Sequence, residues 1–397
     1  MANSLDLMVP ELWKPDLQDW LNARLVAEKI CNMKWSDMLR SGDVIHWNSI
    51  ADFRVQSYTP GTDLTIDALT AADSSLTINR SKAATAYIDP QETKQVEAKE
   101  YVGRASKQAS FALARELDQH VLSTGIAGVA TGNTVSGGTL TITSSNVFDK
   151  VAEARGILSE NNAVDGEMFM VCNPTITAKI SQAGVVNGFK LSDDVQMKGI
   201  SQFFGEYDGF KIYESNDLPT SVTLTIATIP VAAETITVHG VVLTAAASGA
   251  ATAAGEFSIG ANAAAAVVNI VLALNGTGTP GATTYRDFSA ENRRKLQAAG
   301  LVATATSATV TTIASTGAIR GAETLTAAAD VFGTETTSVL FGRVGAISCA
   351  RQMGPDVYFK EEPKQLGHNM IAHQLYGDAV FSRDAFRLAK MTVVNTY

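Results

Sequence analysis

The sequence predicts an α+β chain into which a second, smaller α+β domain is inserted. Three observations support this prediction. A β-rich stretch at 43–88 is followed by one long amphipathic segment at 89–124, and alternating helix and strand patterns come after it. At Val222 the composition then changes abruptly. Residues 222–333 hold eleven charged residues in 112, against 18% for the whole chain, and are dominated by Ala, Thr, Gly and Val.

Length, charge and cysteine content exclude several classes of protein. A chain of 397 residues buries a sizeable core and is expected to hold two or more compact units. The net charge of -9 argues against a dedicated nucleic-acid binder, which needs clustered Lys and Arg. Cys31, Cys172 and Cys349 are far apart, so neither a disulfide framework nor a zinc knuckle is predicted. Residues 1–10 lack the pattern of a signal peptide, and no apolar run is long enough to span a membrane.

The N-terminal segment, residues 9–35, is predicted to form an amphipathic helix or a broken helix, because Pro10 and Pro15 interrupt its first half. Trp13 and Trp20 lie in this segment, ahead of any unit that could enclose them. Aromatic anchors are common both in cores and at interfaces. The segment is therefore expected to dock on its own chain or on a neighbouring subunit, and the sequence leaves both open.

The stretch 43–88 is predicted to form a long β-hairpin. Extended patterns lie on both sides of a turn at 58–63, which has Pro60-Gly61 at its centre. The tip, residues 63–75, has little that could form a core of its own. Because an isolated hairpin is marginal in water, we expect this one to lie on another surface. The predicted strands are 44–47, 53–55, 76–78 and 86–88.

Residues 89–124 are predicted to form one uninterrupted helix. Asp89 supplies an N-cap, Pro90 occupies the first helical position, and Glu92 completes the capping pattern. Gly125 is the expected left-handed residue that ends the helix. At about 1.5 Å per residue the helix is roughly 50 Å long, and alanines on its apolar stripe let a sheet or helix approach closely. The predicted stripe is Ala98, Tyr101, Val102, Ala105, Ala109, Phe111, Ala112 and Leu113, and the predicted polar side is Lys99, Glu100, Arg104, Lys107, Arg115 and Asp118.

After this helix the chain is predicted to build an α/β body. Val147, Val151, Ala154 and Leu158 recur at helical spacing, which indicates a helix over 146–158. The other predicted elements of the body are strands at 140–143, 168–172, 210–214, 339–341, 357–361 and 385–394 and a short helix that begins at Asn173-Pro174. The predicted elements of the inserted domain are strands at 222–229, 235–244, 301–305 and 309–314 and helices at 261–275, capped by Gly276, and at 290–299.

No motif in the sequence predicts catalysis, a metal site or a cofactor. Residues 276–281 match the dinucleotide-binding string G-x-G-x-x-G, but this loop follows a predicted helix and contains proline, whereas a phosphate loop precedes a helix. His368 and His373 are five apart, which places them on opposite faces of a strand or about 140° apart on a helix, and no carboxylate lies at ligand spacing beside them. The remaining candidates are the isolated His46, His120 and His239 and the adjacent carboxylates Asp193-Asp194 and Glu361-Glu362, which are expected to be solvated. We therefore predict a protein that is not an enzyme and has no catalytic, cofactor-binding or metal-binding residues.

The order of these parts resembles the major capsid protein of tailed bacteriophages, the Hong Kong 97-type shell fold that encapsulins also use. An apolar N-terminal arm, an extended hairpin, a spine helix entered through Asp-Pro and an α/β body with a closing strand occur in that order. The resemblance spans about residues 5–220 and 336–395. The phrases that carry it are Pro10-Glu11-Leu12-Trp13, Gly42-Asp43-Val44-Ile45, Tyr58-Thr59-Pro60-Gly61-Thr62-Asp63-Leu64 and the run from Phe341-Gly342-Arg343 through Phe359 to the C-terminus.

The resemblance implies a division of the chain into named units. Lys82 is the only lysine in the hairpin, and no cross-link to a neighbouring subunit is expected there. The implied units are an N-terminal arm (1–40), an extended loop hairpin (41–88), a peripheral domain with the spine helix (89–144, helix 89–124), an axial domain (145–221), the inserted Ala/Thr/Gly-rich domain (222–335), the return of the axial domain (336–355) and the C-terminal strands of the peripheral domain (356–397).

The resemblance also implies a function and partners. It implies a structural protein that self-assembles through hexamers and pentamers into an icosahedral shell, which encloses phage double-stranded DNA without sequence-specific binding. A separate scaffolding protein and a portal protein are implied partners, a decoration protein is a further candidate, and no membrane is involved. The shell would form in the host bacterial cytoplasm and end in the virion. Two alternatives stay open: an encapsulin-like nanocompartment shell, and a phage tail or adhesin protein in which the inserted domain is the working part.

Overall fold

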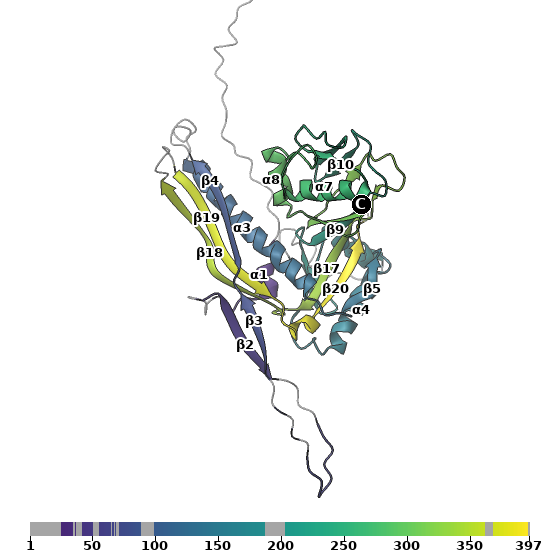
Figure 1. Cartoon of the computed structure of the whole chain (residues 1–397). Helices are drawn as coiled ribbons and strands as arrows, with labels where there is room; N and C mark the ends of the chain where they lie inside the picture. The colour runs from purple at the N-terminus through teal and green to yellow at the C-terminus, as the bar shows by residue number, and fades with distance from the viewer. Residues whose placement is uncertain are drawn as a thin grey trace, which may run out of the picture.

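The chain folds around one long helix, two large sheets and a projecting ribbon (Figure 1). The computed structural model describes residues 25–34, 36, 42–50, 55–64, 66, 68, 71–88, 99–186, 203–361 and 368–395. Several predictions lie outside these residues and stay predictions: Trp13 and Trp20 of the N-terminal segment, the helix start at Asp89-Pro90, and the pair Asp193-Asp194.

A four-stranded sheet carries the long helix α3, Lys99–Ala127, on one face. Ala105, Ala109 and Leu113 of α3 pack against Met370 and Ala372 of this sheet. The expected close approach along alanines is therefore confirmed, because short side chains leave a thin layer between helix and sheet. The strand order is β1 (Cys31–Asn32), β18 (Ile347–Glu361), β19 (His368–Ala379) and β4 (Arg80–Ile88).

Two details of the predicted helix are wrong. Ala112, placed on the buried stripe, is exposed. Gly125 does not end the helix, because α3 continues through it to Ala127. A Cβ at position 125 would lie 2.6 Å from Cδ1 of Ile347 and 3.0 Å from Cδ2 of Leu340. The glycine therefore permits close contact between the helix and the strands beside it, and it is not a left-handed cap.

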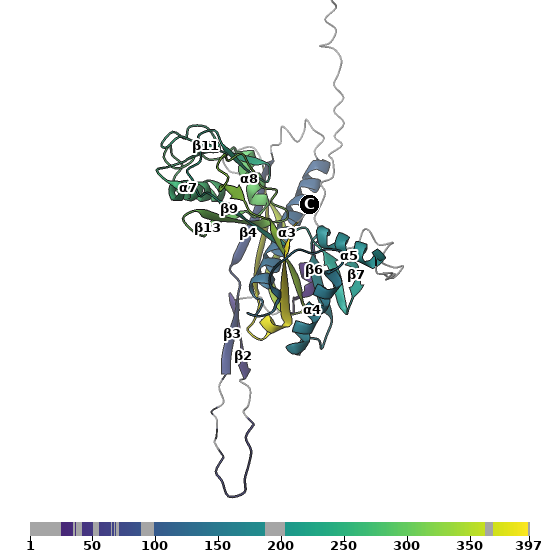
Figure 2. The same ribbon diagram turned by 90° about the vertical axis from the view of Figure 1, so that its right-hand side faces the viewer.

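The predicted hairpin divides into two parts. β2 (Val44–Ile50) pairs with β3 (Ala71–Thr77) as an antiparallel ribbon that projects from the body (Figures 1 and 2). The turn at its far end is confirmed, since the amide of Thr62 donates to the carbonyl of Thr59 and Gly61 has φ +89°. In contrast, β4 leaves the ribbon and pairs with β19, and Val55 is not in a strand. β4 therefore pairs with β19, a strand that packs against α3, and does not continue the hairpin.

A ten-stranded sheet forms the centre of the body, and its strands come from both sides of residues 222–332 and from within them. Strand β20 pairs with β17 and β5 in this sheet, although residues 356–397 were expected with the spine helix. The strand order is β13 (Val302–Ala305), β14 (Val310–Thr316), β9 (Pro219–Thr225), β17 (Thr336–Arg343), β6 (Met168–Cys172), β8 (Phe210–Glu214) and β7 (Phe203–Tyr207), with β16 (Val331–Phe332) on β9, β20 (Leu388–Val394) on β17, and β5 (Thr134–Leu140) on β20.

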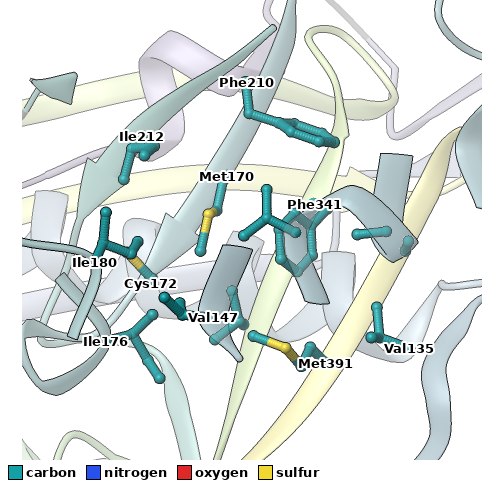
Figure 3. Packing of buried hydrophobic residues seen from close by; sticks show 14 of the residues in the cluster. Val135, Val147, Met170, Cys172, Ile176, Ile180, Phe210, Ile212, Phe341 and Met391 are labelled. Atoms are coloured by element: carbon teal, nitrogen blue, oxygen red, sulfur yellow. The ribbon is translucent and has the colours of Figure 1, made fainter. Parts of the chain in front are cut away.

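Two helices cover one face of this sheet, α4 (Val147–Glu160) and α5 (Pro174–Val186). The predicted stripe of α4 is confirmed, because Val147, Val151, Ala154 and Leu158 are all buried in one cluster. Figure 3 shows the same cluster around Met170, Phe341 and Met391. The opposite face packs Phe169, Val171 and Leu340 against α3 residues such as Val121. The sheet is thus a central layer between helices.

Two strand predictions near this core are displaced. The strand expected at 140–143 ends at Leu140, because the side chain of Asn146 bonds the backbone of Thr141 and Thr143 and builds a turn before α4. The last strand was expected from Ala385, but residues Asp384–Arg387 form the 3-10 helix η2 and β20 begins at Leu388.

Residues 222–332 enclose a hydrophobic cluster of their own. The predicted C-terminal cap is confirmed, because Gly276 ends α7 at φ +65°. The helix starts at Ala263 and not at residue 261, because Oδ1 of Asn262 accepts from the amide of Ala265 and caps the N-terminus. The predicted strand 235–244 is wrong, since His239 and Gly240 both have positive φ and turn it into a hairpin. The elements are β10 (Thr235–Val238), β11 (Val241–Ala246), β12 (Glu256–Ser258) and β15 (Ala322–Glu323) in one sheet, with helices α7 (Ala263–Asn275) and α8 (Ala290–Ala298).

The boundary of this region lies inside a strand. β9 begins at Pro219, before the composition change, and ends at Thr225, where the expected strand 222–229 was longer. It ends there because the carboxylate of Asp330 accepts from the amides of Ala227 and Thr228. β9 pairs with β14 on one side and with the start of β17 on the other. The region therefore shares a continuous sheet with the body.

Candidate functional site

The residues that the sequence singled out for chemistry do not converge in the described part of the chain. No group of three or more His, Cys, Asp or Glu side chains there could hold a metal ion. His46 lies 2.9 Å from Asp73 across the ribbon, and His373 lies 3.0 Å from Ser81 between β19 and β4. His368 stands at the exposed start of β19. Each histidine thus has a separate local environment.

The glycine string 276–281 also has a structural role. Gly276 caps the C-terminus of α7, and the backbone oxygen of Thr277 accepts from the hydroxyl of Tyr285. Helix C-termini present carbonyl oxygens, which repel phosphate. The match to the nucleotide-binding string is therefore a match of letters only.

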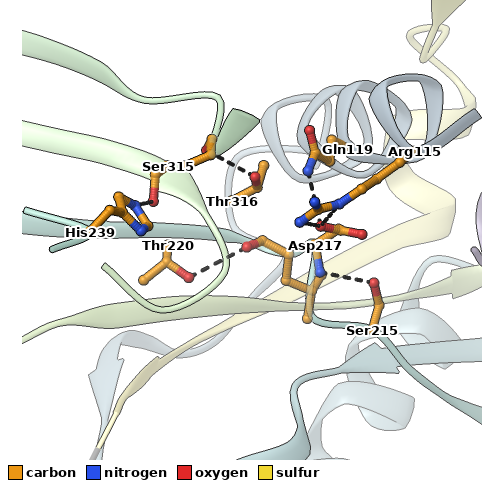
Figure 4. Close-up of polar contacts among 10 residues, drawn as sticks. Arg115, Gln119, Ser215, Asp217, Thr220, His239, Ser315 and Thr316 are labelled. Carbon is orange, nitrogen blue, oxygen red and sulfur yellow. Dashed lines mark hydrogen bonds and ion pairs between the residues drawn. The ribbon is translucent and has the colours of Figure 1, made fainter. Parts of the chain in front are cut away.

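An open cleft of about 920 Å³ lies between the 222–332 region and the body. Its walls include Arg115 of α3, Thr220 of β9 and His239 at the β10–β11 turn (Figure 4). Nε2 of His239 lies 2.9 Å from the hydroxyl of Ser315, and burial lowers the pKa of this histidine. Ser315 is itself buried in β14, so its hydroxyl is closed to a substrate. The histidine therefore joins two strands and does not activate a nucleophile.

Beside this cleft one carboxylate ties the spine helix to the body (Figure 4). Asp217, which is 0% exposed, accepts with Oδ1 from Nε of Arg115 at 2.9 Å, from its second guanidinium nitrogen at 2.8 Å and from Nε2 of Gln119 at 2.9 Å. Charge-assisted hydrogen bonds to a buried carboxylate hold the donating side chains in a defined geometry. Arg115, expected on the solvent side, is thus part of the support.

The polar side of the spine helix binds other elements at neighbouring positions. Glu116 receives the hydroxyl of Tyr376 at 2.6 Å and the ammonium of Lys82 at 2.7 Å. Burial raises the pKa of Tyr376 above its usual range, so the phenol stays protonated and donates. His120 lies 2.7 Å from Oδ1 of Asp378, a close charge contact whose angle is not that of a hydrogen bond.

The environment predicted for Asp118 is wrong. This residue was expected among solvated residues, but it is 1% exposed and binds the chain at residues 26–27. Helical periodicity assigns one buried face, whereas α3 has chain packed on several sides. The only sequence signal was the Asp itself in a stretch rich in Leu and Val, which does not distinguish a buried carboxylate from an exposed one.

The ribbon and its loop carry exposed apolar side chains without a core. Val55 is 95% exposed and Ile66 is 92% exposed, while Tyr58 and Leu64 are more than half exposed. Among the described residues the ribbon pairs with no third strand. Only its base is covered, where Leu76 and Ile78 pack on Ala350 and Phe381. Exposed apolar side chains gathered on one projection mark an interaction surface.

No protein-family model matches the sequence, and no curated protein matches it either. In the described residues no helix is both long and apolar enough to cross a membrane.

Solved structures, in contrast, match over nearly the whole chain. A structure from Mycobacterium phage Che8 has a TM-score of 0.58 at 14% identity, with 97% of this chain and 96% of that chain covered. The capsid structure of cyanophage P-SCSP1u has a TM-score of 0.52 at 13% identity, with 100% and 96% covered. The capsid of the myovirus XM1 has a TM-score of 0.50 at 8% identity, with 99% of both chains covered. The chain therefore has a phage capsid fold.

Proposed function

We propose that this chain is the major capsid protein of a tailed bacteriophage and assembles with many copies of itself into an icosahedral shell around double-stranded DNA. The observation that carries the proposal is the match to phage capsid structures from one end of both chains to the other. A match of this extent includes the projecting ribbon and the spine helix, which are the parts that a compact enzyme domain does not need. The proposed role is structural and not catalytic.

The ribbon supplies the physical reason for assembly. A two-stranded ribbon is marginal in water when nothing covers it. Val55 and Ile66 are almost fully exposed at its loop, and burying each would contribute about 1.5–3 kcal/mol. A neighbouring copy is the partner that every subunit of a shell has beside it. Head-to-tail contacts that close into rings would then cover the loop of each subunit in turn.

The remaining parts of the proposal follow from the capsid role. Copies would form the hexamers and pentamers of the shell with a separate scaffolding protein and a portal protein. The net charge of -9 suits a container that holds DNA without sequence-specific contacts. Assembly would take place in the host bacterial cytoplasm, and the product would be the virion.

The domain assignment is part of the same proposal. The four-stranded sheet with α3 would be the peripheral domain, and the ten-stranded sheet with α4 and α5 the axial domain. The 222–332 region would be an inserted domain on the outer surface, where a decoration protein could bind it. Its separate hydrophobic cluster supports this division. The shared strand β9 would hold such an inserted domain rigidly on its host.

Assembly can be tested with one pair of matched variants. The wild-type chain is coexpressed with its scaffolding protein and examined by sedimentation and negative-stain microscopy. We expect shells of uniform size that contain DNA after packaging. The double variant Val55→Asp/Ile66→Asp should fold but form no shells, because it places charges where the loop meets a neighbour. Val268→Asp is the control, since Val268 is 51% exposed on α7 and far from the ribbon in sequence.

Three results would contradict the proposal. The wild-type chain could stay monomeric at high concentration with scaffold present. The loop variant could assemble as well as the wild type, which would remove the ribbon from the interface. Particles that form without the scaffolding protein and enclose another protein but no nucleic acid would instead support the nanocompartment alternative.

A further inference from the structure

One carboxylate of the spine helix holds the start of the described chain. Oδ1 of Asp118 accepts from the amide of Val26 at 2.7 Å and from the amide of Ala27 at 2.5 Å. These amides lie at the N-terminus of the short helix α1, Ala27–Ile30. We name residues 25–34 the root.

The root is packed into the body and is not part of a free arm. Val26 and Ile30 are 0% exposed and lie in the cluster between α3 and the two large sheets. The carbonyl of Ile30 accepts from the amide of Gly345 at 2.8 Å, and Arg351 pairs with Glu28 at 3.0 Å. Residues 25–34 of the arm predicted over residues 1–40 are therefore fixed on the body.

The second oxygen of Asp118 is the weak point of this arrangement. Oδ2 is buried and has no hydrogen-bond partner among the described residues. Burial raises the pKa of Asp118 to about 6, the two amides lower it by less, and the negative charges of Asp217 and Glu28 raise it further. An ionised Asp118 thus leaves one charged oxygen desolvated. A proton on Oδ2 would remove that charge and leave Oδ1 free to accept from both amides.

We propose that Asp118 is an acid-closed latch: protonation of its unpartnered oxygen holds the root on the spine helix, and loss of the proton loosens it. The latch belongs to the fold of the single chain, so it stands or falls independently of shell formation. The charged and titratable groups on the elements packed around it are Glu28 and Lys29 on α1, Cys31 on β1, Arg115, Glu116 and His120 on α3, Tyr213 and Asp217 beside β8, and Cys349, Arg351, Tyr376 and Asp378 on β18 and β19.

The sign of the pH dependence follows from the two states of Asp118. In the open root the carboxyl is solvated and titrates near its ordinary value of about 3.9, whereas in the closed root its pKa is about 6. The closed state therefore binds the proton more tightly and is favoured at low pH. It loses this advantage as the pH rises through about 6. Linkage predicts an opening equilibrium about ten times larger at pH 8 than at pH 5.

Hydrogen exchange of the amides of Val26 and Ala27 in the full-length chain measures this opening directly. Rates are corrected for the intrinsic pH dependence and compared at pH 5 and pH 8. Asp118→Asn is the matched variant, because it keeps the shape and both acceptor bonds but carries no charge at any pH. We expect a roughly tenfold change in opening for the wild type and a change below twofold for Asp118→Asn. Buried amides of α4, such as that of Val151, are the internal reference.

The proposal is overturned if the wild-type root opens equally at both pH values, or if Asp118→Asn keeps the wild-type pH dependence. The second outcome would assign the effect to His120 or another neighbour. Asp118→Leu removes the acceptor and should leave the root open at both pH values. If that variant does not fold, the comparison of wild type with Asp118→Asn still decides.

Discussion

Replacing Gly377 with alanine tests how the ribbon is seated on the body. Gly377 lies in β19, where the end of β3 crosses it. A Cβ at this position would lie 2.2 Å from the carbonyl oxygen of Thr77 and 2.9 Å from Cα of Ile78. Both atoms belong to the backbone, so no change of rotamer can relieve the overlap. The two strands must move apart by about 1 Å, which is the excess over ordinary van der Waals contact.

The size of the effect follows from two opposed terms. Overpacking a well-packed site costs about 1–3 kcal/mol, and a clash with backbone belongs at the upper end. The shift would also loosen Leu76 and Ile78, which seal the base of the ribbon against Ala350 and Phe381. Alanine offsets about 0.5–1 kcal/mol of this by restricting the unfolded chain. We expect the free energy of unfolding to fall by about 2 kcal/mol.

Urea unfolding followed by circular dichroism measures this loss, and limited proteolysis of the ribbon shows where it acts. Gly354→Ala is the control, because Gly354 lies in the adjacent strand β18 and a Cβ there has nothing within 4 Å. That variant should be as stable as the wild type or slightly more stable. The reasoning is refuted if Gly377→Ala unfolds within about 0.5 kcal/mol of Gly354→Ala, since steric overlap would then be irrelevant.

Two further predictions concern the supports of the body. Asp217→Ala leaves Arg115 and Gln119 without their shared acceptor. The free energy of unfolding in urea should fall by about 2–3 kcal/mol, which is less than for a fully buried ion pair because Arg115 is 36% exposed. An unfolding free energy equal to that of the wild type would contradict this. Asn275→Ala removes two hydrogen bonds of 2.8 Å to the backbone of Ala303 in the edge strand β13. The unpaired edge should then promote aggregation, which is measured as a rise in light scattering. Unchanged scattering at equal concentration would show that this side chain does not protect the edge.

Part of the fold could be predicted from the sequence because it is written in local patterns. The α4 stripe from Val147 to Leu158 and the buried strand 168–172 depend only on spacing and apolar content. Gly276 ends α7 through the chemistry of helix C-termini. The order of the parts then gave the resemblance to phage capsid proteins, and the fold comparison supports that same class.

The supports of the candidate site could not be predicted in the same way. Arg115 and Asp118 lie on the side of α3 that periodicity assigns to solvent, yet each binds an element distant in sequence. Gly125 has the sequence position of a helix cap, and only contact with Leu340 and Ile347 shows its use in packing. A pattern in one segment carries no information about which other segments come to lie beside it.

The sequence by itself determined the helix α4, the C-terminal end of α7 and the turn at 58–63. It also determined that the chain has two differently composed regions and that the tip of its ribbon has too few apolar residues for a core. These properties depend on neighbours along the chain. Only the tertiary structure decided that β4 pairs with β19, that β9 belongs to both regions, and that the amides of residues 26–27 donate to Asp118. The reason is physical: backbone ladders accept almost any partner strand, and the choice among them is made by side-chain packing and buried charge between segments far apart in sequence.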